Sequence, residues 1–370
     1  MGLVRLFFAY IVAVGHWRAL ALTPRGIDLR DSFELHITSG HAVLFFYVIS
    51  GFLITYTLST NYASNSTGIA AFYRNRAVRI FSGYWPVVLL AFITIPGAWL
   101  AFASASVADQ FAGLFLFTMD WRTAFAEYPA VHWGSSIVGL HQAWTLGAEM
   151  TFYLMAPLLM RSWKLAFVLL AASAAWRLGF VAINGGAIND VWTYHFAVST
   201  IGFFMLGHLA CVAAKRFKIN PVIGVLLTVA AFVTMVLAPR GEFDGPRFWI
   251  ATLLFAGGLP GLFAATKSNR WLNYLGDLSY PLYLTHPLVF IWWGDDIAQA
   301  VLSHVDVTRM RAPFLSTGAF LVAAIAVAII FHHAIEAPIA NALKSKQRRA
   351  ELDDVVGDQG RLREQGELPP

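Results

Sequence analysis

Arg5 and His16 lie eleven residues apart in an amino-terminal segment that is apolar enough to cross a bilayer. Ionisable side chains inside such segments are costly and usually mark a functional site. Eleven residues make almost three turns of an α-helix, so both side chains project from one face, roughly 16 Å apart along the axis. A surface cation and a deeper imidazole on one stripe are suited to a charged ligand that threads its reactive end into the membrane.

Glu149 is the carboxylate that the sequence places at the same depth as His16. Each residue is six positions from the predicted outer end of its apolar segment, and equal counts along a helix predict a common level. A carboxylate beside an imidazole fixes its tautomer and stabilises the imidazolium. We therefore predict His16 and Glu149 as catalytic residues, with a hydrogen-bonded structural histidine as the alternative.

Arg76 and Arg79 are three residues apart at the entry to the third apolar segment. At that spacing they share a helix face, and paired guanidinium groups bind phosphate or pyrophosphate through forked hydrogen bonds. Ordinary anchoring of a cytoplasmic loop is the alternative. Since Arg5 is expected on the same side of the membrane, we predict that Arg5, Arg76 and Arg79 bind a phosphate-bearing cofactor or donor.

His286 falls near the middle of the ninth apolar segment, between Pro281 and Pro287, which free backbone carbonyl groups. A kinked helix of this kind is typical of a polar tunnel wall, with structural hydrogen bonding as the alternative. The residues predicted to contact substrate or to line this tunnel are aromatic or polar: Trp144, Tyr153, Tyr280, Tyr283 and His286.

Glu336 lies beside His332 and His333, which is weak evidence for a metal site because no partner cluster accompanies it. We expect a structural ion pair instead, formed with an arginine of an inner loop, and no metal site. Ser50 and Gly51 lack the Gly-x-Ser-x-Gly setting of a nucleophile, so they predict close helix packing.

The composition indicates a membrane protein. The 370 residues are 58% hydrophobic and only 13% charged, with a mean hydropathy of +0.61, whereas a soluble chain would carry about twice that charge. The sequence predicts an all-α polytopic bundle of ten transmembrane helices. The expected spans are residues 3–22, 40–59, 82–102, 143–160, 164–183, 195–214, 219–238, 247–265, 278–297 and 314–340, with 111–119 as an interfacial or re-entrant piece.

The distribution of lysine and arginine predicts the orientation. With a cytoplasmic amino terminus, the inner connections hold 14 basic residues and the outer ones hold 7, so both termini are expected in the cytoplasm. Residues 1–343 then form the membrane domain and residues 344–370 a polar, disordered tail. Cleavage of residues 1–22 as a secretory signal is the less favoured alternative, because His16, Trp17 and Arg18 precede the small-residue site.

Other classes of protein are disfavoured. The single Cys211 excludes an internal disulfide framework. We find no nucleic-acid signal, because the net charge of +5 arises from basic residues distributed among the loops according to membrane topology.

The predicted outer loops carry residues that could stack on sugar rings or form an interfacial belt: Asp120, Trp121, Tyr128, Trp133, Trp192, Tyr194 and Phe243.

Six segments, taken in order, resemble the acyltransferase-3 family of integral membrane acyltransferases. They are Arg5 through His16, residues 40–54 (GHAVLFFYVISGFLI), Arg76-x-x-Arg79 with Ile80 and Tyr84, Trp144-Thr-Leu-x-x-Glu149 with Phe152 and Tyr153, Leu275-Gly276 with residues 279–286 (SYPLYLTH), and Ile335-Glu336-Ala337-Pro338. The chain departs from the pattern at Ala42, Val43 and Leu44, where the family often has an acidic residue. This departure concerns acceptor recognition.

The resemblance implies a multi-pass protein of the bacterial inner membrane that takes an acyl group, usually acetyl, from acyl-CoA at the cytoplasmic face. The acceptor would be a hydroxyl of a cell-surface or lipid-linked glycan, and no cofactor would be bound permanently. Arg5, Arg76 and Arg79 would hold the donor phosphates, and His16 would act as a general base or carry the acyl group. Some members add an SGNH hydrolase-like domain; here either that partner would be a separate chain or the acceptor would come to the outer membrane face directly.

A second class of function fits the same residues. Arg5, His16 and Glu149 could form the path of a proton-coupled transporter or flippase for a glycan or an organic anion. Such transporters often have repeated halves, and we find no repeat in this sequence. The expected partners are therefore acyl-CoA, a glycan acceptor and the bilayer, and the sequence leaves a homo-oligomer open.

Overall fold

The computed structural model describes residues 1–25, 37–62, 64–116, 140–184, 190–217, 219–238, 243–303 and 311–345. These ranges are helical and contain no strand, which confirms the all-α class. The predicted tail beyond residue 345 lies outside them. The helices are α1 (Gly2–Trp17), α2 (Ser39–Asn61), α3 (Ser66–Thr94), α4 (Ala98–Ser104), α5 (Val107–Phe115), α7 (Trp144–Leu159), α8 (Trp163–Ile183), α9 (Ala197–Arg216), α10 (Pro221–Val236), α11 (Pro246–Thr266), α12 (Arg270–Leu302) and α13 (Arg311–Phe331).

Each of the ten predicted spans overlaps a helix, although the third also crosses the break between α3 and α4. In the described part of the chain, seven helical segments are long and apolar enough to cross a membrane, and α10 is apolar but shorter. The helix α7 has only 16 residues, and α12 has 33 residues but carries Asp277, Asp295 and Asp296. A polytopic membrane protein is therefore confirmed, while the count of ten and the side of the termini remain predictions.

The predicted bounds of the third span are wrong. The helix α3 begins at Ser66, capped by the Asn65 side chain, so Arg76 and Arg79 lie well inside it. It ends at Thr94 because Ile95 precedes Pro96 and adopts an extended conformation, and Gly97 has φ of 79°. Hydropathy located the apolar part of this helix but not its polar first turns.

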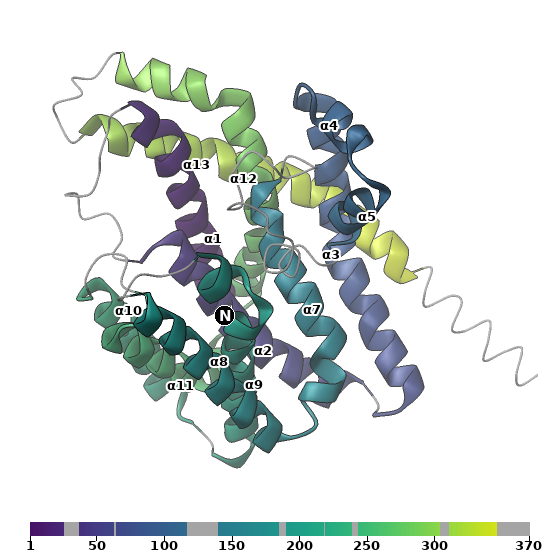
Figure 1. The fold of residues 1–370 in the computed structure, drawn as a ribbon, viewed down its shortest axis with the longest axis vertical. Coiled ribbons are helices and arrows are strands. Elements are labelled where there is room, and N and C mark those ends of the chain that lie inside the picture. The colour runs from purple at the N-terminus through teal and green to yellow at the C-terminus, as the bar shows by residue number, and fades with distance from the viewer. Residues whose placement is uncertain are drawn as a thin grey trace, which may run out of the picture.

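The centre of the molecule is formed by α1, α2 and α12, with α8 to α11 grouped on one side and α3, α5 and α7 on the other (Figure 1). The helices α1 and α12 run parallel: Gly2 packs directly against Leu272 and Gly276 at one end, and His16 meets His286 at the other. This pairing places the polar residues of α12 beside the Arg5 to His16 face of α1.

Two glycines let α2 and α9 approach closely. A Cβ atom added at Gly51 would lie 1.9 Å from the Phe204 carbonyl oxygen, and one at Gly207 would lie 2.0 Å from that of Val48. The prediction of close packing is confirmed for Gly51, because backbone atoms cannot move aside without separating the helices.

We expect Gly51→Ala to lower the free energy of unfolding by about 1–3 kcal/mol, the usual cost of overpacking. The thermal unfolding midpoint of the purified protein measures this. Gly179→Ala is the matched control, because a Cβ there meets nothing within 4 Å. Equal midpoints for the two variants would contradict the packing argument.

Candidate active site

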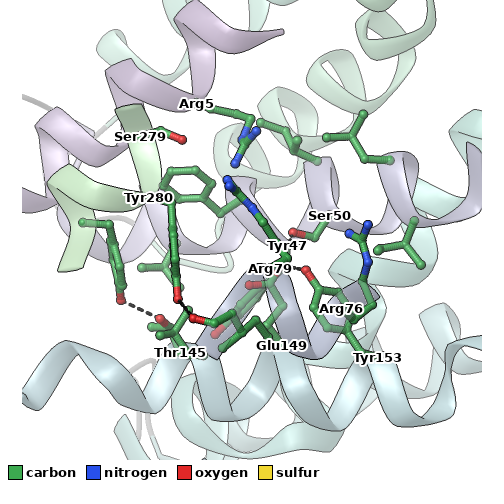
Figure 2. A pocket seen from close by; sticks show the side chains of 18 residues that line it. Arg5, Tyr47, Ser50, Arg76, Arg79, Thr145, Glu149, Tyr153, Ser279 and Tyr280 are labelled. Atoms are coloured by element: carbon green, nitrogen blue, oxygen red, sulfur yellow. Dashed lines mark hydrogen bonds between the residues drawn. The ribbon is translucent and has the colours of Figure 1, made fainter. Parts of the chain in front are cut away.

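One pocket collects polar residues from five helices. Figure 2 shows Arg5 of α1 facing Glu149 and Tyr153 of α7, with Arg76 and Arg79 of α3 turned into the same space. The other polar lining residues are Tyr47 and Ser50 of α2, Thr145 of α7, and Ser279, Tyr280 and Tyr283 of α12. The structure thus brings together all three predicted phosphate-binding arginines, although they come from two helices that are far apart in the sequence, α1 and α3.

The three arginines differ in how they are held. The Arg79 guanidinium lies 3.3 Å from a carboxylate oxygen of Glu336 and 5.2 Å from the centre of the Tyr280 ring. The Arg76 guanidinium lies 5.9 Å from the Tyr153 ring, and its buried Nε has no hydrogen-bond partner among the described residues. A buried donor without a partner is costly, so Arg76 is suited to bind an anion that enters the pocket.

Among the described residues, the carboxylate of Glu149 binds Ser50 and Tyr153 rather than His16. It accepts a hydrogen bond of 2.8 Å from the Ser50 hydroxyl and a second, short one from the Tyr153 hydroxyl. Ser50 was predicted only to pack, and the structure corrects this. Glu149 therefore belongs to the arginine pocket, where its negative charge partly balances Arg5.

Equal counts from the segment ends do not give Glu149 and His16 a common level, because α7 and α12 are offset along their axes. Thr145 of α7 pairs with Tyr283 of α12, and His286 lies three residues further toward the carboxyl end of α12. Glu149 lies four residues further along α7 in the opposite direction. The two shifts together separate Glu149 from the level of His16 by about 10 Å.

In the described part of the chain, His16 pairs instead with His286. The Nδ1 atom of His16 lies 2.8 Å from Nε2 of His286, and the two rings meet edge to edge, with centres 5.1 Å apart and planes 26° apart. His286 is completely buried, and its own Nδ1 lies 3.0 Å from the Leu282 carbonyl oxygen. His286 was predicted as a tunnel residue, and the structure places it against the imidazole that was predicted to react.

The pocket ends short of this histidine pair. Thr145 and Tyr283 line the pocket, whereas neither His16 nor His286 does. The hydroxyl oxygens of Thr145 and Tyr283 are 2.5 Å apart, and the Tyr283 ring centre lies 6.1 Å from that of His286. Of the predicted tunnel residues, Tyr153, Tyr280 and Tyr283 therefore line this pocket, whereas Trp144 and His286 do not.

The remaining predicted residues lie around the pocket. Tyr280 lines it and donates a hydrogen bond of 2.6 Å to the Ile80 carbonyl, while Trp144 lies outside it against His195, with ring centres 4.1 Å apart. Glu336 pairs with Arg79 and also with His332 at 2.8 Å. Among the residues that the structure describes, no three His, Cys, Asp or Glu side chains form a metal-binding group.

The predicted outer aromatic residues are only partly described. The ring centres of Tyr194 and Phe243 are 6.2 Å apart, and Trp192 packs on Trp176. Asp120, Trp121, Tyr128 and Trp133 lie outside the described residues. The sequence interpretation also overlooked Arg177, a charged residue within an apolar segment, which is itself a recognised signal.

Comparison with known proteins agrees with this architecture. The acyltransferase-3 family model, described as an acyltransferase domain, matches residues 1–333. Nodulation protein 10 of Rhizobium leguminosarum bv. viciae is 33% identical over 319 residues, which cover 78% of this chain and 81% of that protein. No solved structure matches the chain. The chain therefore belongs to the acyltransferase-3 family of membrane acyltransferases.

Proposed function

We propose that this acyltransferase moves an acetyl group from cytoplasmic acetyl-CoA to a hydroxyl of a cell-surface or lipid-linked glycan across the bacterial inner membrane. The observation that carries the proposal is the pocket in which Arg5, Arg76 and Arg79 converge. Arg5 belongs to the same helix as His16, so the pocket and the predicted reactive imidazole share one rigid element.

The charges of the pocket fit the phosphates of the donor. Three guanidinium groups are opposed by two carboxylates, Glu149 in the pocket lining and Glu336 beside Arg79, which leaves an excess of positive charge. Guanidinium groups bind phosphate through paired, charge-assisted hydrogen bonds. The pantetheine arm would then follow α1 toward His16, over roughly 16 Å.

At the far end of this path, His16 has two possible roles in acyl transfer. As a general base it takes the proton of the acceptor hydroxyl while that oxygen attacks the thioester carbonyl; the C–S bond breaks, and the CoA thiolate is then protonated. As a nucleophile it first carries the acyl group itself. Both routes begin with a neutral imidazole and a lone pair on one ring nitrogen.

We expect Arg76→Ala to weaken binding of CoA about 10- to 100-fold, because a charge-assisted hydrogen bond contributes about 1.5–3 kcal/mol. Calorimetry with purified protein measures the affinity. Arg74→Ala is the matched control, since it removes the same charge from the same helix but does not line the pocket. Equal losses in both variants would show only a general surface charge effect and would reject the phosphate role.

The reaction itself is tested with membranes that contain the protein and acetyl-CoA labelled in its acetyl group. An acyltransferase leaves label covalently bound to a glycan, whereas a transporter or flippase leaves the glycan unlabelled. Mass analysis of the glycan then identifies the acylated hydroxyl. Absence of glycan-bound label in the presence of the cell's own envelope glycans would reject the proposal.

A further inference from the structure

We propose that His286 is the positioning residue of His16, and that it holds His16 in the tautomer with the proton on Nδ1 and the lone pair on Nε2. The geometric part of this inference stands on the hydrogen bonds of the two rings. Its catalytic consequence rests on the proposed function, in which His16 reacts.

The Nδ1 atom of His286 carries a proton. It lies 3.0 Å from the Leu282 carbonyl oxygen, and a carbonyl oxygen only accepts hydrogen bonds, so this nitrogen carries a proton. Pro287 has no backbone N–H, so the Tyr283 carbonyl, one turn earlier, lacks its usual helical hydrogen bond. This carbonyl oxygen is then free to accept a hydrogen bond from the same ring. The backbone of α12 thus determines which nitrogen of His286 is protonated.

The other ring nitrogen of His286, Nε2, carries a lone pair. His286 is completely buried, and among the described residues its ring contacts another histidine, a tyrosine and a backbone carbonyl rather than a carboxylate. A buried imidazolium without a countercharge is expensive, so His286 is neutral. A neutral imidazole with a proton on Nδ1 has only a lone pair on Nε2, and that atom faces His16.

The short contact between the two rings determines the tautomer of His16. His16 Nδ1 lies 2.8 Å from Nε2 of His286. Two lone pairs at this distance would repel each other, so His16 must donate its Nδ1 proton. A neutral His16 then carries its lone pair on Nε2, the nitrogen directed away from His286.

This arrangement suits both roles of His16. When His16 takes up a proton on Nε2, its Nδ1–H bond to His286 becomes charge-assisted and therefore stronger. The neutral ring of His286 thus stabilises the imidazolium through a hydrogen bond. If His16 instead carries the acyl group, the same Nε2 lone pair forms the C–N bond as the C–S bond of the thioester breaks, and CoA leaves as the thiolate.

The direct test is ¹⁵N nuclear magnetic resonance of the full-length protein, labelled at histidine and reconstituted in bilayers. The His16 signals are assigned by their loss in His16→Gln. The parent should show a protonated Nδ1 and an unprotonated Nε2 at His16. His286→Gln, whose side-chain oxygen can still accept, should retain this state, and His286→Phe should produce a mixture of both tautomers.

Kinetics give a second readout. His286→Phe should lower kcat on the order of 10²-fold with the KM for acetyl-CoA unchanged, because the arginine pocket is intact, and His286→Gln should restore most of the rate. The inference is overturned if parent His16 is protonated on Nε2, or if His286→Phe leaves the tautomer unchanged. The parental spectrum decides even if a variant fails to fold. A parent that shows the expected tautomer but transfers no label would reject the proposed function alone.

Discussion

His16→Ala is expected to abolish acyl transfer while the protein remains folded in the membrane. A general acid–base group contributes about 10²- to 10⁴-fold to a rate, and the alternative acyl-carrier role would leave no reaction at all. The measurement is the transfer of labelled acetyl from acetyl-CoA to glycan. Affinity for CoA should not change, because His16 does not line the arginine pocket.

His333→Ala is the matched control for this experiment. His333 is an exposed histidine whose imidazole is hydrogen-bonded to the Tyr274 hydroxyl at 3.0 Å, and it lies outside the pocket lining. Its removal should leave transfer close to the parental rate. Unchanged acetylation in His16→Ala would remove His16 from the mechanism, and a parallel loss of CoA binding would show that the substitution disturbs the donor pocket.

The second large effect concerns a buried ion pair that links α8 to the segment before α11. The Nε and Nη2 atoms of Arg177 donate to the two carboxylate oxygens of Asp244 at 2.7 and 2.9 Å, and Nη1 donates to the Thr193 carbonyl. Arg177 is 1% exposed. Asp244 also has φ of 62°, a conformation that non-glycine residues adopt only where the surroundings support it.

We expect Asp244→Ala to lower the free energy of unfolding by about 3–5 kcal/mol, because it leaves a buried guanidinium without its countercharge. Denaturant or thermal unfolding in detergent measures the loss. Asp295→Ala is the control: its pair with Arg25 is short, but the Asp295 side chain is 90% exposed, so the expected cost is below about 1 kcal/mol. Similar losses in the two variants would contradict a buried, uncompensated charge as the cause.

Several features of the site followed from spacing along the chain. Arg5 and His16 lie on one helix, and Arg76 and Arg79 both reach one pocket. These predictions succeeded because residues within a helix have a geometry that local hydrogen bonds determine. The all-α membrane class followed in the same way from the length and apolarity of each segment.

The contacts between helices were not available from such spacing. Hydropathy locates the apolar centre of a helix, but it does not give the tilt or axial offset of one helix against another. For this reason Glu149 was assigned to His16, whereas in the structure it binds Ser50 and Tyr153. His286 replaces it as the partner of His16 because α1 and α12 run parallel and in close contact, and this alignment depends on side-chain packing between segments about 270 residues apart in the sequence.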